Sequence, residues 1–535
     1  MYKKVDCNSS LTATRAFCSA TTNRLCSRNV TAHPSQTVRT PGVGLLESSL
    51  WLTFVIAIGT LLRFIRLGTK SFWLDEAASA TLARLDWHAF WGAITHRQAN
   101  MVLYYLLLRG WIKLGSSEFV IRSLSVLAGV AAIPAIYLLG ARLFGPKAGR
   151  VAALLLCVHA FHIRYSQEAR AYSLFMLLAI MSCLFFLLSL EQPSRKHWAA
   201  YILLSTLMVY AQVFGGWMLL AQWISLSFRR GAIAWKQFLL SVSIICLFVS
   251  PLAYSLLFAS DRTQLHWLTK PTLQDLYKLS LDMTGNGSPF LLLAYGALVL
   301  ISVVPGVGGI RSHSADSWKY WFLSTWLVLP VALVLVISLR WPVFEPRYLI
   351  FCLPPLVLLG SDTLIRIGSR VLFASALMVV LGLSLSGTYS YYRGRADAEH
   401  TDDWRDATRY VLAEVRASDA VLFNYSEERL AFDEYQVQFH VTGSPIHEFP
   451  EQTDLELLTL RPSRPSPELL DKIFTGYKRV WVISAYQPNQ YSLPAEVALK
   501  AHFSQHGDRS FGFVRVELFH DKIPEASGRR ETSAQ

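Results

Sequence analysis

Residues 51–77 read WLTFVIAIGTLLRFIRLGTKSFWLDEA, an apolar run that ends in arginines and is followed by two aromatic residues and two adjacent acids. About 20 mostly apolar residues cross the hydrocarbon core of a bilayer as a helix. The run at 48–67 therefore predicts a membrane span, and Asp75 and Glu76 are expected just beyond its end. It is not followed by a small-residue cleavage site, so a cleaved signal peptide is not indicated.

Similar apolar runs recur along the chain. The eleven candidate spans lie at 48–67, 118–141, 148–164, 171–190, 198–211, 212–228, 237–258, 289–310, 319–339, 348–365 and 371–390. Of the 535 residues, 53% are hydrophobic and 16% are charged, whereas soluble domains are about 25% charged. The sequence predicts a polytopic α-helical membrane protein, although residues 198–228 also fit one long kinked helix.

The net charge of +13 is distributed unevenly. Residues 391–535 carry −6 and the residues before them carry +19. Counted from a cytoplasmic N-terminus, the short inner loops hold twelve Lys and Arg, whereas the short outer loops hold only Arg164, Arg170, Arg340 and Arg347. Cytoplasmic loops carry such an excess. We therefore expect a multi-pass protein of a cell membrane, taken to be a bacterial inner membrane, and no nucleic-acid partner.

Three regions are expected along the chain. Residues 1–47 are rich in Ser, Thr and Arg without apolar periodicity, which predicts a disordered cytoplasmic tail or an over-long gene start. Residues 48–390 form the transmembrane domain. Residues 391–535 predict a small extracytoplasmic α/β domain, because helices alternate there with short apolar strands. The predicted elements are helices at 403–416, 467–474 and 494–505, and strands at 420–425, 479–485 and 511–519.

Two outer loops are amphipathic. In the first, at 68–117, apolar and Trp residues recur at helical spacing; they are Leu82, Leu85, Trp87, Phe90, Trp91 and Ile94. In the second, a similar stripe at 273–281 follows Pro271. Trp-rich helices of this kind lie in the bilayer interface. Together they predict a cavity at the outer membrane surface.

Asp75 and Glu76 are the first candidates for chemistry. A carboxylate there could take a proton from an acceptor hydroxyl or hold a divalent cation. Equally, Asp75 could be the N-cap of a helix, with Glu76 favoured by the helix dipole. No metal-ligand cluster is evident, because the seven cysteines form no CxxC pair and no cluster with histidines.

Two further polar clusters lie on the predicted outer side. One spans 162–172 and the other spans 344–348; they contain Tyr165, Gln167, Glu168, Arg170, Glu345, Arg347 and Tyr348. Arginine binds phosphate with two parallel hydrogen bonds. The alternative is that Arg170 and Arg347 snorkel, or pair with Glu168 and Glu345. They belong to the four arginines that are exceptions to the inward charge bias of the short loops, which favours an extracytoplasmic anion.

Five motifs in order resemble the GT-C glycosyltransferases, most closely family 39 and its bacterial relatives, the protein O-mannosyltransferases and lipid A aminoarabinose transferases. They are Arg63-Phe-Ile-Arg-Leu-Gly, Phe72-Trp-Leu-Asp75-Glu76-Ala, Asn100–Trp111 with Tyr105, Tyr165–Tyr172 and Pro346-Arg-Tyr348. The resemblance covers roughly residues 48–410. Met101-Val102 departs from the Pro that many relatives have before Leu-Tyr-Tyr, which leaves the subgroup and the acceptor open.

The resemblance implies a polyprenyl-phosphate sugar donor, a catalytic acid in the first outer loop and chemistry on the extracytoplasmic face. We expect an inverting transfer to a hydroxyl of a lipid, glycan or protein, with Asp75 as base and Glu76 beside it. Arg170, Arg347 and Arg63 would bind the donor phosphate. Tyr165, Gln167, Glu168, Tyr105, Glu345 and Tyr348 would support them. The alternatives are a transporter or flippase of lipid-linked sugars and a membrane anchor for the C-terminal domain.

Overall fold

The computed structural model describes residues 41–96, 100–229, 233–259, 268–285, 288–308, 315–394, 402–441, 447–451, 465–485 and 494–521. Disorder was predicted for residues 1–47; residues 1–40 lie outside the described residues, and residues 41–47 are helical instead. Helix α1 (Pro41–Phe64) begins before the predicted boundary at residue 48. Pro41 is its first residue, where a missing N–H costs no intrahelical hydrogen bond.

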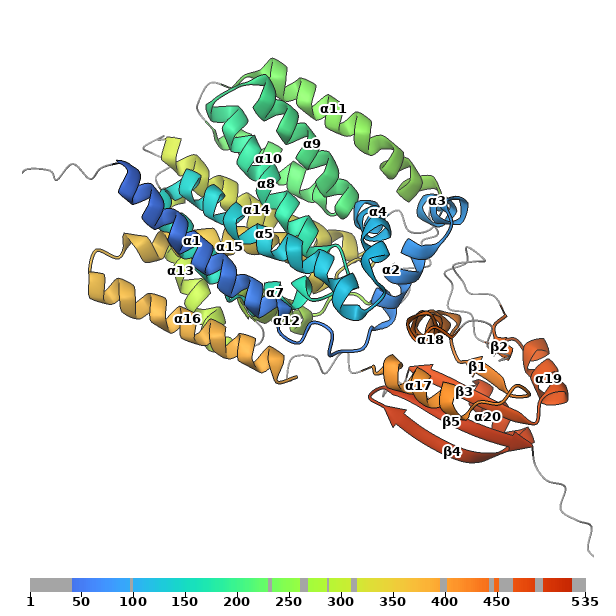
Figure 1. The fold of residues 1–535 in the computed structure, drawn as a ribbon. Coiled ribbons are helices and arrows are strands. Elements are labelled where there is room, and N and C mark those ends of the chain that lie inside the picture. The colour runs from blue at the N-terminus through green and yellow to red at the C-terminus, as the bar shows by residue number, and fades with distance from the viewer. Residues whose placement is uncertain are drawn as a thin grey trace, which may run out of the picture. The chain divides into compact units, whose positions relative to one another are not determined.

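Helices make up most of the chain before residue 393 (Figure 1). After α1 they are α2 (Leu74–Arg84), α3 (Trp87–His96), α4 (Val102–Trp111), α5 (Glu118–Phe144), α6 (Pro146–Cys157), α7 (Ala160–Ser166), α8 (Tyr172–Glu191), α9 (Arg195–Ala211), α10 (Gly215–Ser225), α11 (Trp235–Tyr254), α12 (Leu273–Gly285), α13 (Pro289–Gly308), α14 (Ala315–Ser338), the 3-10 helix η6 (Pro346–Cys352), α15 (Leu353–Arg366) and α16 (Arg370–Tyr392).

Six helices of the described part are long and apolar enough to cross a membrane, and the bent pair α12 and α13 would make a seventh. The six are 118–144, 172–191, 235–258, 317–338, 346–366 and 370–392. The chain is therefore a mostly helical protein with several membrane-spanning helices. The count of eleven spans and their orientation stay predictions.

One predicted span differs from the structure. The run at 148–164 is divided into α6 and α7, because His159 adopts an extended backbone between them. The predicted separation of 198–211 from 212–228 matches the break between α9 and α10, where Gln212 is extended (φ −161°, ψ 126°). Gly215 follows the break, and a Cβ on it would lie 3.1 Å from the Cα of Val209. A larger residue there would push the two helices apart.

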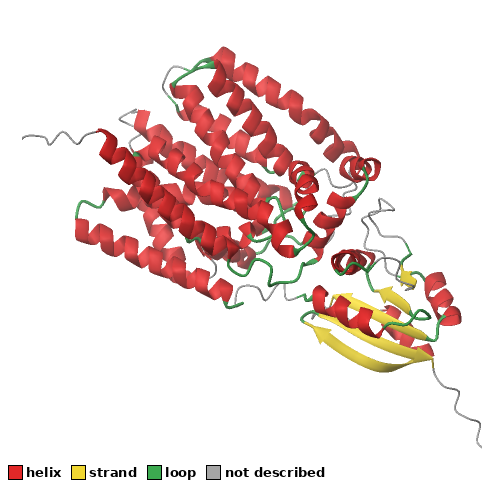
Figure 2. Ribbon diagram, viewed as in Figure 1, coloured by secondary structure: helices red, strands yellow, loops and turns green. Residues whose placement is uncertain are grey.

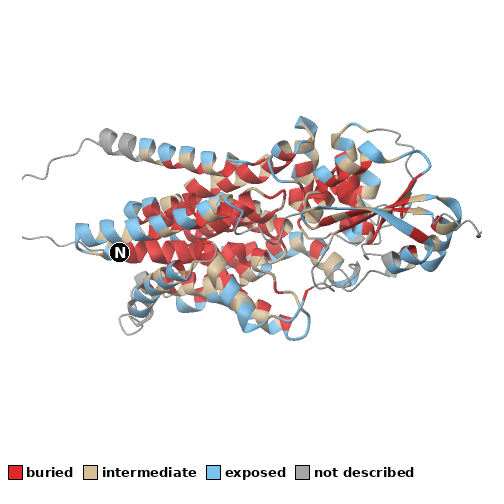
Figure 3. Cartoon of the chain, turned by 90° about the horizontal axis from the view of Figure 1, so that it is seen from below, coloured by how far each residue is buried: buried red, intermediate tan, exposed pale blue. Residues whose placement is uncertain are grey.

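Helices at the centre of the bundle, such as α8 and α15, are mostly buried, whereas α11 and α16 are mostly exposed (Figure 3). In α11 and α16, large apolar side chains such as Leu247, Phe248 and Leu372 are exposed. Contiguous exposed apolar side chains mark a surface that meets lipid or a partner. Between α5 and α6 the backbones approach closely, since a Cβ on Gly149 would lie 2.5 Å from the carbonyl of Tyr137. Small residues allow this packing in membrane helices.

The segment at 68–117 contains the helices α2, α3 and α4, as its amphipathic pattern predicted. Its apolar stripe buries Leu82, Phe90 and Ile94, while Trp87 and Trp91 stay exposed. Asp86 caps α3 by accepting from the backbone N–H groups of His88 and Ala89.

The C-terminal part has a five-stranded mixed sheet (Figure 2). Its elements are α17 (Trp404–Glu414), β1 (Ala420–Phe423), α18 (Ser426–Gln438), β2 (His447–Phe449), α19 (Pro467–Gly476), β3 (Arg479–Ala485), α20 (Pro494–His502), β4 (Phe503–Phe511) and β5 (Val514–Asp521). The strand order is β2-β1-β3-β5-β4. Strand β1 runs parallel to β2 and β3, whereas β5 is antiparallel to β3 and β4.

Two boundaries in this region differ from the prediction. The helix expected at 494–505 ends at His502, and the strand expected at 511–519 is mainly β5, which forms a hairpin with the unpredicted strand β4. The hairpin turns at Gly512, whose φ of 61° favours glycine. Strand β4 was not predicted because its sequence, FSQHGDRSF, shows no alternation of apolar and polar residues. All but its first residue are at least partly exposed, so none of them needs to be apolar. Helix α18 and strand β2 were not predicted either.

Candidate functional site

The Asp75 carboxylate lies at the start of α2, between two arginines. Its Oδ2 is 3.5 Å from a terminal nitrogen of Arg170 and 3.8 Å from one of Arg347. The N-cap of α2 is Trp73, without a side-chain capping bond. Asp75 is therefore not the N-cap, and its side chain is directed at the two cations. It is 37% exposed, whereas the side chains of Arg170 and Arg347 are only 12% and 9% exposed.

Arg170 is held by the first turn of α2. Its Nη1 donates to the carbonyl of Asp75 at 3.2 Å and to the hydroxyl of Ser79 at 3.1 Å. Ser79 in turn donates to the carbonyl of Asp75. The guanidinium thus contacts both the backbone and the side chain of Asp75, so their relative positions are fixed.

Arg347 comes from a different part of the chain. It follows Pro346 at the start of η6, and its Nε lies 3.4 Å from Glu345. Its guanidinium lies 5.1 Å from the ring centre of Trp73 and 5.9 Å from that of Tyr348, which fits cation–π contacts. The Arg347 side chain is nearly buried, so water screens its charge only weakly. Its attraction for an anion is therefore stronger than that of an exposed arginine.

Aromatic side chains surround the two arginines. The ring centres of Tyr165 and Tyr172 are 5.2 Å apart, and those of Tyr172 and Tyr348 are 6.4 Å apart. Tyr105, on α4, is also buried. The site therefore combines two arginines, the carboxylates of Asp75 and Glu345, and a wall of tyrosine rings.

Glu76 faces away from Asp75, although it is the next residue. Its two oxygens accept hydrogen bonds from Arg122 at 2.8 and 2.6 Å. One of them also accepts from the backbone N–H of Ala169 at 2.7 Å. Neighbouring residues of a helix lie about 100° apart around its axis. Glu76 therefore orients Arg122 and not the two arginines beside Asp75.

Among the described residues, the contacts of Arg63 do not include Asp75, Arg170 or Arg347. It is fully buried, and its terminal nitrogens donate to the carbonyls of Gly59, Leu156 and Cys157. One of them also lies 2.7 Å from Nδ1 of His162. Arg63 thus satisfies carbonyl groups at the break between α6 and α7.

Gln167 and Glu168 lie in the turn between α7 and α8. Gln167 donates to the carbonyls of Arg63 and Ile65 and accepts from the hydroxyl of Tyr391. Glu168 lies 3.6 Å from Arg164. Burial raises the pKa of Glu168 to about 7, even though Arg164 acts in the opposite direction.

A cavity of about 290 Å³ adjoins this turn. It is lined by Arg66, Leu67, Thr69, Lys70, Ser71, Trp73, Glu76, Arg122, Gln167, Glu168, Tyr391, Tyr392, Arg393 and Gly394. Burial lowers the pKa of Lys70 to about 8, and Arg122 lowers it further. The cavity shares Trp73 with the surroundings of Arg347.

The described residues include no group of three or more His, Cys, Asp or Glu side chains that could hold a metal ion. The expectation of a divalent cation therefore stays a prediction.

The sequence interpretation missed two contributors to the site. Arg122 lies in the buried face of α5, and Ser79 accepts from Arg170. Arg122 could have been found, because it is a charged residue within the predicted span 118–141, and such residues are costly in a membrane. Ser79 carries no such signal.

The comparisons with known proteins relate the chain to a class of membrane enzymes. Residues 100–254 match the model of a family described as dolichyl-phosphate-mannose-protein mannosyltransferase. No curated protein is significantly similar to the chain in sequence. Among solved structures, ArnT from Cupriavidus metallidurans in the apo state has a TM-score of 0.63 at 12% identity, over 88% of this chain and 98% of that one.

The same ArnT bound to undecaprenyl phosphate has a TM-score of 0.61 at 12% identity and the same coverage. Together these findings give the chain the GT-C fold and relate it to the GT-C superfamily, as the sequence motifs predicted.

Proposed function

We propose that the chain is a glycosyltransferase that moves a sugar from a polyprenyl-phosphate donor to a hydroxyl of a lipid, glycan or protein on the extracytoplasmic face. The observation that carries the proposal is the half-exposed Asp75 carboxylate beside the nearly buried Arg170 and Arg347. The family match and the GT-C fold support the same class of reaction.

Arg170 and Arg347 would hold the phosphate of the donor. Each guanidinium is already fixed by other contacts, Arg170 by Ser79 and Arg347 by Glu345 and Trp73. Cations that are fixed in advance stabilise the charge that grows on a leaving group without reorganising. ArnT from Cupriavidus metallidurans was solved with undecaprenyl phosphate bound, which supports a lipid phosphate as the anion. The lipid chain would lie among the helices.

Asp75 would act as the general base. The acceptor oxygen attacks the anomeric carbon, the bond from that carbon to the phosphate oxygen breaks with its electron pair going to the phosphate, and the hydroxyl proton passes to Asp75. The products are the glycosylated acceptor and the polyprenyl phosphate.

We expect inversion at the anomeric carbon, because this is a single displacement. Retention would need a second carboxylate as a nucleophile. Glu76 is the adjacent acid, and Arg122 occupies both of its oxygens. The proposal therefore assigns Glu76 a supporting role.

A deletion strain tests the proposal whatever the identity of the sugar. Membrane glycolipids and glycoproteins are compared by mass spectrometry between deletion cells and cells that regain either the wild-type chain or Asp75→Asn. We expect one glycoconjugate to disappear and to return with the wild type alone. Full recovery with Asp75→Asn at equal protein level would leave transport or anchoring as the function.

A further inference from the structure

The backbone between α1 and α2 is held by two arginines from different parts of the chain. The first is Arg122 of α5, which donates to the carbonyls of Leu67, Lys70 and Ser71 at 3.0, 2.8 and 2.9 Å. Arg122 is nearly buried and paired with Glu76. It therefore ties the segment to the membrane helices.

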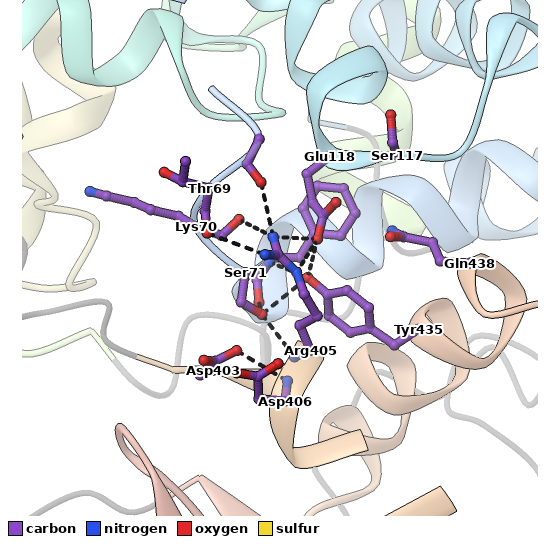
Figure 4. A network of polar contacts seen from close by, with 12 residues as sticks. Thr69, Lys70, Ser71, Ser117, Glu118, Asp403, Arg405, Asp406, Tyr435 and Gln438 are labelled. Carbon is purple, nitrogen blue, oxygen red and sulfur yellow. Dashed lines mark hydrogen bonds and ion pairs between the residues drawn. The ribbon is translucent and has the colours of Figure 1, made fainter. Parts of the chain in front are cut away.

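The second is Arg405 of α17, in the C-terminal part. It donates to the carbonyls of Gly68 and Thr69 at 3.1 and 3.2 Å, and to that of Lys70 at 3.0 Å (Figure 4). All five carbonyls from residue 67 to residue 71 thus accept from one guanidinium or the other. An irregular segment would otherwise leave these carbonyl groups unpaired or dependent on water.

Arg405 is itself fixed from the membrane side. Its Nε and a terminal nitrogen lie 2.8 and 2.6 Å from Oε1 of Glu118, the first residue of α5. The same oxygen accepts from the hydroxyl of Tyr435 on α18 at 2.9 Å (Figure 4). The side chains of Arg405 and Glu118 are 23% and 10% exposed, so the pair is largely shielded from water. Charge-assisted bonds of this kind are about twice as strong as neutral ones.

Two more bonds join the C-terminal part to the same segment. The backbone N–H of Arg405 donates to the hydroxyl of Ser71 at 3.1 Å, and the backbone N–H of Phe72 donates to the hydroxyl of Tyr435 at 2.7 Å. The far end of α2 is held as well, because Arg84 donates to both oxygens of Glu434 on α18. The C-terminal part therefore holds α2 at both ends.

We propose that Arg405 is a positioning residue through which the C-terminal domain sets the place of Asp75. The segment that it holds leads through Phe72 and Trp73 directly into the first turn of α2. Releasing the segment would let the start of α2 shift, and with it the carboxylate that faces Arg170 and Arg347. The catalytic part of this inference rests on the proposed function of Asp75, whereas the structural part does not.

Hydrogen exchange measured by mass spectrometry on the full chain in detergent tests the structural part. In Arg405→Ala, peptides that cover residues 66–76 should exchange about 10-fold faster or more, the change that 1.4 kcal/mol of lost stabilisation produces. Peptides from β3 and β5 should keep their protection. Arg409→Ala is the control, because Arg409 lies on the same helix with an exposed side chain and pairs with Asp406.

Glu118→Gln repeats the test from the membrane side, with the sequence of the C-terminal domain unchanged. Glu118→Gln should also speed exchange in residues 66–76. If Arg405→Ala fails to fold, this variant tests whether the contact between Arg405 and Glu118 holds the segment. Exchange in this segment no faster than in Arg409→Ala, in the folded variant, overturns the proposal.

A transfer assay tests the catalytic part. With Arg405→Ala, kcat should fall at least 10-fold while KM for the donor changes less than threefold, because Arg170 and Arg347 remain. Arg405→Lys keeps the positive charge but loses the planar set of N–H donors of the guanidinium, and should recover only part of the rate. A wild-type chain without transfer activity would defeat the proposed function, yet the exchange experiment would still decide the role of Arg405.

Discussion

The guanidinium of Arg170 contacts Asp75 twice: it donates to the backbone carbonyl of Asp75 at 3.2 Å and lies 3.5 Å from the carboxylate of Asp75. A group proposed to bind phosphate and a group proposed to accept a proton are therefore held in one frame. Arg347, which lies in η6, is 3.8 Å from the same carboxylate. The distance between donor phosphate and base would then be set by the fold and not by the substrate.

Asp75→Asn should fold and insert normally, because the amide keeps the size of the side chain and can still meet both arginines. Turnover should fall by about 100-fold or more, the usual contribution of a positioned base. Donor binding should change much less, since the proton is removed in the transition state. The control is Asp86→Asn, at the exposed cap of α3, which should transfer at the normal rate. A near-normal rate for Asp75→Asn would remove Asp75 from the mechanism.

Arg170→Lys and Arg347→Lys should each weaken donor binding about 10-fold or more. Lysine keeps the charge but loses the planar pair of donors that fits a phosphate. The measurement is donor affinity, for example by competition with a polyprenyl phosphate. Arg340→Lys is the matched control, because Arg340 is exposed and lies beside the ring of Trp341. Normal donor affinity in both site variants would return these arginines to a structural role.

The sequence predicted the general nature of the site better than its connections. Asp75, Arg170 and Arg347 could be selected because they lie at the ends of predicted spans, where ionisable residues close to the membrane are candidates for function. The separation of Asp75 from Glu76 could not be predicted, since it depends on Arg122, which is 46 residues away from Glu76. Similarly, the contact of Arg405 with Gly68 joins residues 337 positions apart, and no local pattern encodes it.

Arg122→Ala should destabilise the protein by about 3–5 kcal/mol, because it leaves Glu76 as an unpaired buried charge. Adding Glu76→Gln should recover part of this loss, since the unpaired charge is then removed. Melting temperatures in detergent for the two single variants and the double variant measure the effect. If Glu76→Gln alone abolished turnover with an unchanged melting temperature, Glu76 would belong to the chemistry instead.

The orientation predicts that a reporter fused after Gly394 lies outside the cytoplasm. Eleven spans from a cytoplasmic N-terminus end on the outer side, and the C-terminal domain follows. An alkaline phosphatase fusion at this position should be active, and a fluorescent reporter that folds only in the cytoplasm should be dark. The reverse result would mean that a span has been miscounted or that the whole chain is inverted, and it would remove the support for an extracytoplasmic site.

Glu168 predicts a specific pH dependence of stability. Burial raises its pKa from 4.5 to about 7, so the folded protein binds this proton more tightly than the unfolded chain does. The contribution of Glu168 to stability should therefore fall as the pH rises from about 5 to about 7 and stay low above that. Glu168→Gln cannot ionise, so its melting temperature relative to the wild type should increase across the same range.

Melting temperatures at about pH 5, pH 6.5 and pH 8, followed by tryptophan fluorescence, measure this difference. Glu468→Gln, at an exposed position on α19, serves as the control and should show no such trend. A difference between Glu168→Gln and the wild type that stays constant or shrinks with rising pH would show that Arg164 keeps Glu168 ionised in spite of its burial. In that case Glu168 would act as a fixed negative charge beside the cavity, which Lys70 and Arg66 also line.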